Sequence, residues 1–325
     1  MAGLSNLRMR MTAATIDGPV WIPTLPPSIG EYLAPNLQPI PLIPIIALVL
    51  AATYLLGATT LWRRHVRWSV IRTLAFLIGC LVTVVVTGAG IEGYGYEIFS
   101  VFMFQQVTLM MIIPPLLVCG SPGTLLLKAT PHSGAGLVLL RVALMGLRSP
   151  VSKVLIHPAV TLSLLVTSFY GLYFTGVSDH LLQSWTGHVG LELFFLVAGV
   201  LFAVPLFSTD PLPHRFPYGG KLLEVFIKMP LHVIFGVIVM LSSSQVVTYF
   251  ASPPPSWGVD AILDQRIAGA LAWSYGEFPS LIILLMLLVR WQHDEGVRTR
   301  AADKRRDRDG DVDLDAYNAY LNRLR

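Results

Sequence analysis

The sequence predicts an all-α polytopic membrane protein, built as a bundle of seven transmembrane helices. Hydrophobic residues make up 54% of the 325-residue chain and charged residues only 13%, whereas about a quarter of the residues in a soluble domain are charged. The mean hydropathy is +0.64. Seven apolar segments approach the roughly 20 residues that a helix needs to cross a bilayer. We therefore expect the lipid bilayer, and no nucleic acid, as the partner of this chain with net charge +4.

The elements follow one another in a simple order. Residues 1–38 contain the Pro-rich stretch PTLPPSIGEYLAP and no apolar period, which predicts an extracytoplasmic extended arm. The membrane domain is expected over residues 39–291, followed by a charged tail at residues 292–325. Its predicted spans cover residues 40–62, 69–91, 97–119, 154–176, 187–207, 221–247 and 266–291.

The connection between the third and fourth spans, residues 121–153, contains the interrupted apolar run GAGLVLLRVALMGLR. Arg141 and Arg148 are seven residues apart and share one helical face. This pattern is typical of an amphipathic helix that lies in the membrane interface.

Lys and Arg residues predict the orientation of the bundle, because they accumulate in cytoplasmic loops. They follow the first, third, fifth and seventh spans, whereas the connections near residues 92–97, 178–186 and 248–262 contain none. We therefore expect the N-terminus outside, the C-terminal tail in the cytoplasm, and a multi-pass protein of the plasma membrane.

The third span carries more polar and soft groups than lipid alone would require. It has adjacent amides at Gln105 and Gln106, a break at Pro114-Pro115, and methionines including Met103. Thioether sulfur suits Cu(I), which makes Met103 a candidate metal ligand. The alternative is that the methionines only pack.

Ionisable side chains inside spans are costly and need a partner or a cavity. On the fifth span, His188 and Glu192 lie one turn apart near the outer end, at a depth similar to that of the two glutamines. An imidazole, a carboxylate and two amides predict a hydrated or metal-binding site here.

The sixth and seventh spans carry a second set. Glu224, Lys228 and His232 recur every four residues on one face, so Glu224 and Lys228 can pair. His232 and Glu277 lie at similar depths on antiparallel helices. They are candidates for metal or proton handling; the alternative is a structural pair that fixes helix register.

No enzyme class is favoured. The sequence has no nucleophilic serine with a base partner, no phosphate-binding glycine loop and no haem-attachment motif. Cys80 and Cys119 lie in apolar runs, where we expect them to pack as small buried groups.

Several long segments carry a family resemblance: TGAGIEGYGYEIFS, LMMIIPPLLVCGSPGTLLLKA, GHVGLELFFLVAGVLFAVPLFSTDPLP, KMPLHVIFGVIVM and DQRIAGALAWSYGEFP. They resemble the CtaG family in its actinobacterial form, whose members are multi-span membrane proteins implicated in cytochrome c oxidase assembly. The resemblance implies a non-catalytic assembly factor, with cytochrome c oxidase subunits as partners and copper as the ion it handles.

The chain departs from the family pattern at its third span. Family members carry a His-Met-x-x-His-Met run there, and this chain reads Phe102-Met103-Phe104-Gln105-Gln106-Val107. A fifth-span histidine is also replaced, by Phe194. The positions that match the family are His157, His188, Asp210, His232 and Glu277.

The chain is therefore similar to a divergent member that lacks the third-span motif, and we expect its copper handling to be weakened or altered. Two alternatives stay open: a metal-ion or proton transporter, and a structural partner of the respiratory chain that binds no metal.

Overall fold

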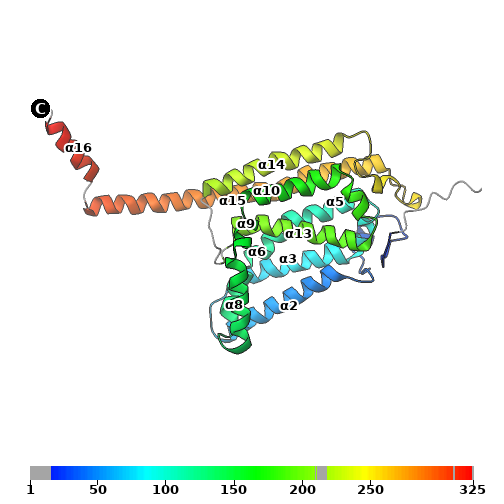
Figure 1. Ribbon diagram of the computed structural model, residues 1–325, viewed down its shortest axis with the longest axis horizontal. Helices are drawn as coiled ribbons and strands as arrows, with labels where there is room; N and C mark the ends of the chain where they lie inside the picture. The colour runs from blue at the N-terminus through cyan, green and yellow to red at the C-terminus, as the bar shows by residue number, and fades with distance from the viewer. Residues whose placement is uncertain (1–15, 209, 211–217, 310–311, 324–325) are drawn as a thin grey trace, which may run out of the picture.

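The computed structural model describes residues 16–208, 210, 218–309 and 312–323, and within them the regular elements are helices (Figure 1). This confirms the predicted all-α class. The longer helices are α2 (Leu42–Arg63), α3 (Val70–Gly88), α8 (Gly134–Arg148), α13 (Trp185–Phe207), α14 (Tyr218–Leu241), α15 (Ala261–Asp309) and α16 (Val312–Arg323). The shorter ones are α1 (Ile29–Tyr32), α4 (Gly90–Gly95), α5 (Phe99–Val107), η1 (Thr108–Ile112), α6 (Ile113–Cys119), α7 (Pro122–Ala129), α9 (Pro150–Leu155), α10 (Pro158–Val166), η2 (Thr167–Gly171), α11 (Leu172–Phe174), α12 (Val177–Leu181), η3 (Thr248–Ala251) and η4 (Pro255–Trp257).

Six helical segments of the described chain are long and apolar enough to cross a membrane: Leu42–Arg63, Val70–Gly88, Phe99–Ala129, Trp185–Phe207, Gly219–Leu241 and Ala261–Ala301. The fourth predicted span, residues 154–176, corresponds to a shorter apolar helix from Pro158 to Phe174. This helix lies beside the long ones in the bundle (Figure 1).

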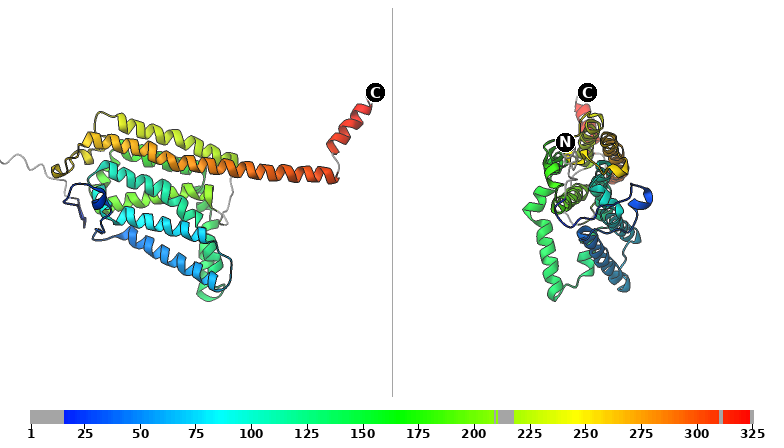
Figure 2. Two further views of the ribbon diagram at one scale, coloured as in Figure 1. Left: turned by 180° about the vertical axis from the view of Figure 1, so that it is seen from behind. Right: turned by 90° about the vertical axis from the view of Figure 1, so that its right-hand side faces the viewer.

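The bundle has two distinct ends. The described part of the N-terminal arm lies at one end, and α8 runs across the opposite end instead of along the long helices (Figures 1 and 2). Beyond that second end α15 continues as a single rod, with α16 after it. The helix thus runs without a break through residue 291, where the sequence predicted the tail to begin.

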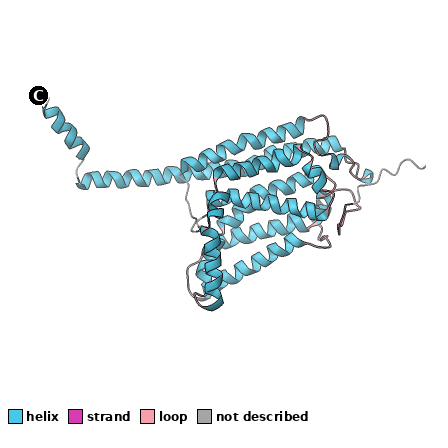
Figure 3. Ribbon diagram, in the orientation of Figure 1, coloured by secondary structure: helices cyan, strands magenta, loops and turns pink. Residues whose placement is uncertain are grey.

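Two more predicted elements differ in extent from the observed helices, which Figure 3 shows joined by loops. The predicted span 221–247 ends at Leu241, because the Gln265 side chain accepts a hydrogen bond from Val246 N (2.7 Å) and donates one to Ser244 O (2.9 Å). The predicted connection 121–153 contains α7, α8 and the start of α9, with breaks after Ala129 and Arg148. Within it, α8 covers the run GAGLVLLRVALMGLR, in which the sequence predicted an amphipathic helix. Pro131 and Pro150 explain these breaks, since the residue before a proline is disfavoured in a helix.

The third span lies at the centre of the bundle. Of its most apolar stretch 72% is buried, against 28–56% for the other five candidate spans. A π-helical turn, η1, interrupts it just before Pro114 and Pro115, which lack the N–H groups that would bond the preceding turn. The Met110 carbonyl lies against Gly199 of α13, where a Cβ would overlap it. The break therefore gives the third span a close contact with α13.

Asp210 fixes α7 to the chain that follows α13. Its carboxylate accepts hydrogen bonds from Gly123 N (3.1 Å) and Thr124 N (2.7 Å) in the first turn of α7, and from the Thr124 hydroxyl. The residue at the usual capping position, Ser121, makes no side-chain cap bond to the helix. Asp210 thus supplies the cap from a distant part of the sequence.

We expect Asp210→Ala to lower the free energy of unfolding by about 1–3 kcal/mol, since hydrogen bonds to a charged group are lost and two amides lose their acceptor. Thermal unfolding of the detergent-purified protein measures this loss. Asp210→Asn, which keeps one acceptor oxygen, should lose less. Equal stability of the wild type and Asp210→Ala would contradict the capping role.

Candidate metal centre

Three buried side chains meet near the end of the bundle that carries the N-terminal arm. Glu92 of α4 and His188 and Glu192 of α13 each offer a ligand atom, and these atoms lie within 4.8 Å of one another. His188 Nε2 is 3.5 Å from Glu92 Oε1. Each residue is at most 3% exposed, so the group is shielded from solvent. No other cluster of three or more His, Cys, Asp or Glu ligands occurs among the described residues.

The local sequence explains why these groups converge. His188 and Glu192 are four residues apart and therefore project from one face of α13. Glu92 comes from a short helix that turns back between α3 and α5. Gly93 lets the N-terminal arm pack closely on this helix, because a Cβ there would overlap the rings of Trp21 and Pro23.

The N-terminal arm covers this end of the bundle. Asp17 is bound to the segment before α13 by two backbone hydrogen bonds, Asp17 N to Gln183 O (2.9 Å) and Trp185 N to Asp17 O (2.8 Å). Tyr94 donates a hydrogen bond to Leu25 O (2.8 Å). The arm is thus part of the wall that keeps the cluster buried.

Neighbouring side chains hold two members of the cluster in place. Gln105 Nε2 donates hydrogen bonds to Glu92 Oε2 (2.7 Å) and to Val86 O (2.9 Å). The ring of Tyr96 stacks on the His188 imidazole, with centroids 3.8 Å apart. Burial, and then the nearby carboxylates of Glu92 and Glu192, raise the pKa of Tyr96, so its phenol stays protonated.

The cluster is poorly satisfied by the protein alone. Both ring nitrogens of His188 and the Oε1 atom of Glu192 lack a hydrogen-bond partner among the described residues. No described lysine or arginine lies within ion-pair distance of Glu92 or Glu192. A cavity of about 10 Å³ borders both carboxylates, which is about the space of one water or ion. His188 does not line this cavity, but its Nε2 atom lies 3.5 Å from Glu92 Oε1. Two carboxylates and an adjacent imidazole are ligands that can hold a single cation.

The second predicted pair lies deeper in the bundle and is separate from the cluster. His232 Nδ1 of α14 is 3.8 Å from Glu277 Oε1 of α15. Gly276 packs directly against the imidazole, and a Cβ there would overlap it. The pairing predicted from helix depth is therefore present, but it brings together only two ligand-type groups.

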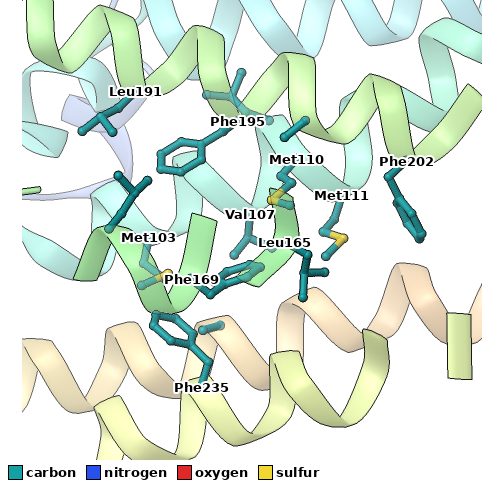
Figure 4. Close-up of a cluster of buried hydrophobic side chains, with 14 of the residues drawn as sticks. Met103, Val107, Met110, Met111, Leu165, Phe169, Leu191, Phe195, Phe202 and Phe235 are labelled. Carbon is teal, nitrogen blue, oxygen red and sulfur yellow. The ribbon is translucent and has the colours of Figure 1, made fainter. Parts of the chain in front are cut away.

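Met103 lies in the apolar core of the bundle. It is fully buried in a group of aliphatic and aromatic residues around the third span (Figure 4). Phe169 and Phe235 belong to the same buried group. These surroundings favour the packing alternative for Met103.

The two adjacent glutamines of the third span have different hydrogen-bond partners. Gln105 binds Glu92, whereas Gln106 accepts a hydrogen bond from the Tyr173 hydroxyl. Phe102 presents its ring to His188, with centroids 5.5 Å apart. The face of the third span that carries Phe102 therefore borders the cluster.

Sequence reasoning found two of the three cluster residues and missed Glu92. It assigned Glu92 to a connection near residues 92–97, where a carboxylate is normally solvated. The signal that could have found it is the glycine-rich motif GAGIEGYG, whose missing side chains let neighbouring segments pack closely on α4. One smaller prediction is confirmed, because Lys228 and Glu224 pair at 2.6 Å. His157, one of the positions that match the family, caps α10 by accepting a hydrogen bond from Ala159 N.

We expect Gly95→Ala to disturb the cluster through Gln105, because a Cβ at this position would overlap Gln105 Oε1. Loss of the amide that orients Glu92 should weaken metal binding by about tenfold, and the overlap should cost about 1–3 kcal/mol of stability. Metal titration and thermal unfolding measure the two effects.

The double variant Gly95→Ala/Gln105→Ser separates these effects. The shorter side chain removes the overlap, so stability should recover, while the donor to Glu92 stays absent and metal binding stays weak. Recovery of both properties would show that Gln105 does not position Glu92.

Comparisons with known proteins identify the family. Residues 52–294 match the model of the cytochrome c oxidase caa3 assembly factor family. An uncharacterized protein of Mycobacterium bovis and one of Mycobacterium tuberculosis are each 37% identical over 293 residues, and one of Mycobacterium leprae is 35% identical. The match covers 87% of this chain but only 43–44% of these relatives, so the chain spans less than half of their length.

No solved structure matches the chain significantly. The family match covers most of the described helices, including α4 and α13, which hold the cluster. On this evidence the chain belongs to the family of cytochrome c oxidase caa3 assembly factors.

Proposed function

We propose that this protein is a non-catalytic, multi-pass assembly factor of the plasma membrane that helps to mature cytochrome c oxidase and passes a metal ion to its subunits. The observation that carries the proposal is the buried Glu92–His188–Glu192 cluster within the family-matching segment. Its unpartnered ring nitrogens and carboxylate oxygen are the groups that a cargo ion would engage.

The donor set favours a divalent ion over Cu(I). Cu(I) prefers thioether, thiolate and imidazole ligands, whereas this cluster offers two carboxylates and one imidazole, and Met103 lies in the apolar core. A divalent cation would balance the charge of two carboxylates that give up their protons to bind it, which matters in a buried site. By the Irving–Williams order Cu(II) would be held most tightly. This is the altered form of copper handling that we propose for the chain.

The family pattern supports this difference. Phe102 and Gln106 occupy the third-span positions where family members carry histidines. Phe102 contacts the His188 ring and Gln106 is bound to Tyr173. Neither side chain can supply the lost imidazole, so the remaining ligands are richer in oxygen.

The topology that we propose has seven spans, with the Pro158–Phe174 helix as the fourth. The end of the bundle that carries α8 is then cytoplasmic, because Arg63, Arg64, Lys128 and Lys153 follow spans at this end. The metal cluster lies near the opposite, outer end. Reporter fusions at residues 30 and 320 should report the outer and cytoplasmic sides, respectively.

A deletion strain tests the proposed function. We expect it to contain less assembled cytochrome c oxidase, with recovery on complementation by the wild-type chain and less recovery with Glu192→Gln. Normal oxidase content and activity in the deletion strain would overturn the proposal. Full recovery by Glu192→Gln, together with co-purification of oxidase subunits without metal, would favour a structural partner instead.

A transporter is the second candidate, and the His232–Glu277 pair favours it. Both ring nitrogens of His232 and one oxygen of Glu277 have no hydrogen-bond partner among the described residues. Such a pair below the cluster could relay a proton or an ion. If so, Glu277→Gln and Glu192→Gln should each reduce metal-ion uptake or proton flux in proteoliposomes, and unchanged rates in both would exclude this function.

A further inference from the structure

A positively charged region lies where α2, α3 and α7 meet, at the end of the bundle that carries α8. The sequence from residue 39 to 91 and from 98 to 178 contains no Asp or Glu, so no carboxylate of these segments can neutralise it. The basic residues in and around this region are Arg63, Arg64, Arg67, Arg72 and Lys128. Asp210, which approaches α7 from outside these segments, is bound to the first-turn amides of that helix.

Part of this region forms a cavity of about 600 Å³. It is lined by Trp62, Arg67, Trp68, Ser69, Arg72 and Lys128. The wall is ordered by its own contacts: Trp62 Nε1 donates a hydrogen bond to Trp68 O (3.2 Å), and the Arg72 guanidinium lies 5.7 Å above the Trp68 ring. The cations of Arg67, Arg72 and Lys128 thus converge on one space and, among the described residues, form no ion pair.

An apolar groove of about 440 Å³ lies beside this cavity, between α2 and α7. Leu50, Gly57, Leu125 and Leu126 are among its lining residues. Gly57 lets the two helices approach closely, since a Cβ there would meet Leu125 at 3.2 Å. The groove adjoins the basic cavity, because Ala129 of the groove directly follows Lys128 of the cavity.

We propose that this region binds an acidic phospholipid, with its phosphodiester headgroup in the basic cavity and an acyl chain in the apolar groove. Arginine and lysine supply hydrogen bonds and charge to the phosphate. Tryptophan is the side chain enriched at the level of lipid headgroups. The exposed face of α2, which includes Leu48 and Leu56, continues the apolar surface toward the membrane interior.

The test uses the full-length protein in mild detergent, with phosphatidylglycerol as the acidic lipid and phosphatidylcholine as the zwitterionic one. Native mass spectrometry gives the retained lipid, and a titration followed by thermal unfolding gives the apparent affinity. The variant is Arg67→Gln/Lys128→Gln, because both side chains are exposed and their loss leaves the core intact. We expect it to bind phosphatidylglycerol roughly thirtyfold more weakly than the wild type.

The matched control is Arg141→Gln/Lys153→Gln, which removes two exposed cations from α8 and α9 at the same end of the bundle. It should bind phosphatidylglycerol like the wild type, and Arg67→Lys should do the same. Equal losses in the two double variants, or equal affinity for both lipids, would overturn the proposal. Inorganic phosphate that matches the lipid's stabilising effect would overturn it as well, since a free anion would then suffice.

Discussion

In the Glu192→Gln protein we expect divalent-metal affinity to fall by about a hundredfold or more. Glu192 is one of two carboxylates in the cluster, and its Oε1 atom has no hydrogen-bond partner among the described residues. Glutamine keeps the size of the side chain but removes one negative charge, so a buried dication is no longer balanced. Even residues that only orient a ligand are worth about 10–100-fold, which sets a lower bound for the loss of a ligand itself.

Elemental analysis and calorimetric titration of the purified protein with Cu(II), Zn(II) and Cu(I) measure this effect. The wild type should bind about one divalent ion per chain, more tightly for Cu(II) than for Zn(II). Cu(I) should bind more weakly than either.

Glu277→Gln is the matched control, because it makes the same chemical change in the other histidine–carboxylate pair. It should leave divalent binding at the Glu92–His188–Glu192 cluster unchanged. A wild-type protein that binds no divalent ion would contradict the metal-site proposal. Equal losses in the two variants would instead indicate that metal binding spans both groups.

The fold could be predicted from the sequence because the bilayer imposes a simple rule. The backbone N–H and C=O groups of a spanning segment must form hydrogen bonds within that segment, so each long apolar run becomes a helix. The runs that became α2, α3 and α13 are found within a few residues of their predicted positions. The end of α14 was missed by six residues, because the side chain of a distant residue, Gln265, binds the chain that follows Leu241.

Two of the three residues of the candidate site could be predicted from the sequence. His188 and Glu192 stand out because ionisable groups are rare within an apolar run. Glu92 lies between spans, where a carboxylate attracts no attention, and tertiary structure alone brings it into the bundle. Its burial depends on the N-terminal arm, which has no period or charge pattern that predicts where it packs.

The roles of the third-span side chains also depended on tertiary structure. The sequence offered Gln105 and Gln106 as equivalent amides, yet one binds Glu92 and the other accepts a hydrogen bond from Tyr173. Met103 has a donor atom suited to copper but lies among apolar side chains. Donor chemistry can be predicted from residue type, whereas convergence on one space requires the positions of all the helices.

A second large effect, on stability, is expected for the Glu224–Lys228 ion pair on α14, which lies toward the end of the bundle opposite the Glu92–His188–Glu192 cluster. Lys228 Nζ lies 2.6 Å from Glu224 Oε1 and 3.0 Å from Thr161 Oγ1, and it sits 4.0 Å from the centre of the Phe202 ring. Both charged side chains are only 5% exposed. We expect Lys228→Met to lower the free energy of unfolding by about 3–5 kcal/mol, because Glu224 is left as a buried charge without its partner.

The double variant Glu224→Gln/Lys228→Met decides what the pair contributes. Removing both charges leaves no uncompensated charge, so most of the stability should return, since a buried ion pair gains little over a neutral pair of similar volume. Lys153→Met, at an exposed position, should change stability by less than about 0.5 kcal/mol. Thermal unfolding in detergent measures all three, and equal costs for the single and double variants would contradict the coupling.

The same double variant separates packing from function. If it assembles as much oxidase as the wild type, the pair serves only to fix α14 against α10 and α13, the helices that carry Thr161 and Phe202. If it is stable but assembles less oxidase, the charges themselves contribute to function. Lys228 and Glu224 lie four and eight residues before His232, so they would extend the polar groups of α14 toward the α8 end of the bundle. The Glu92–His188–Glu192 cluster and this pair would then both contribute to oxidase assembly. In a metal titration, only the cluster should respond to Glu192→Gln.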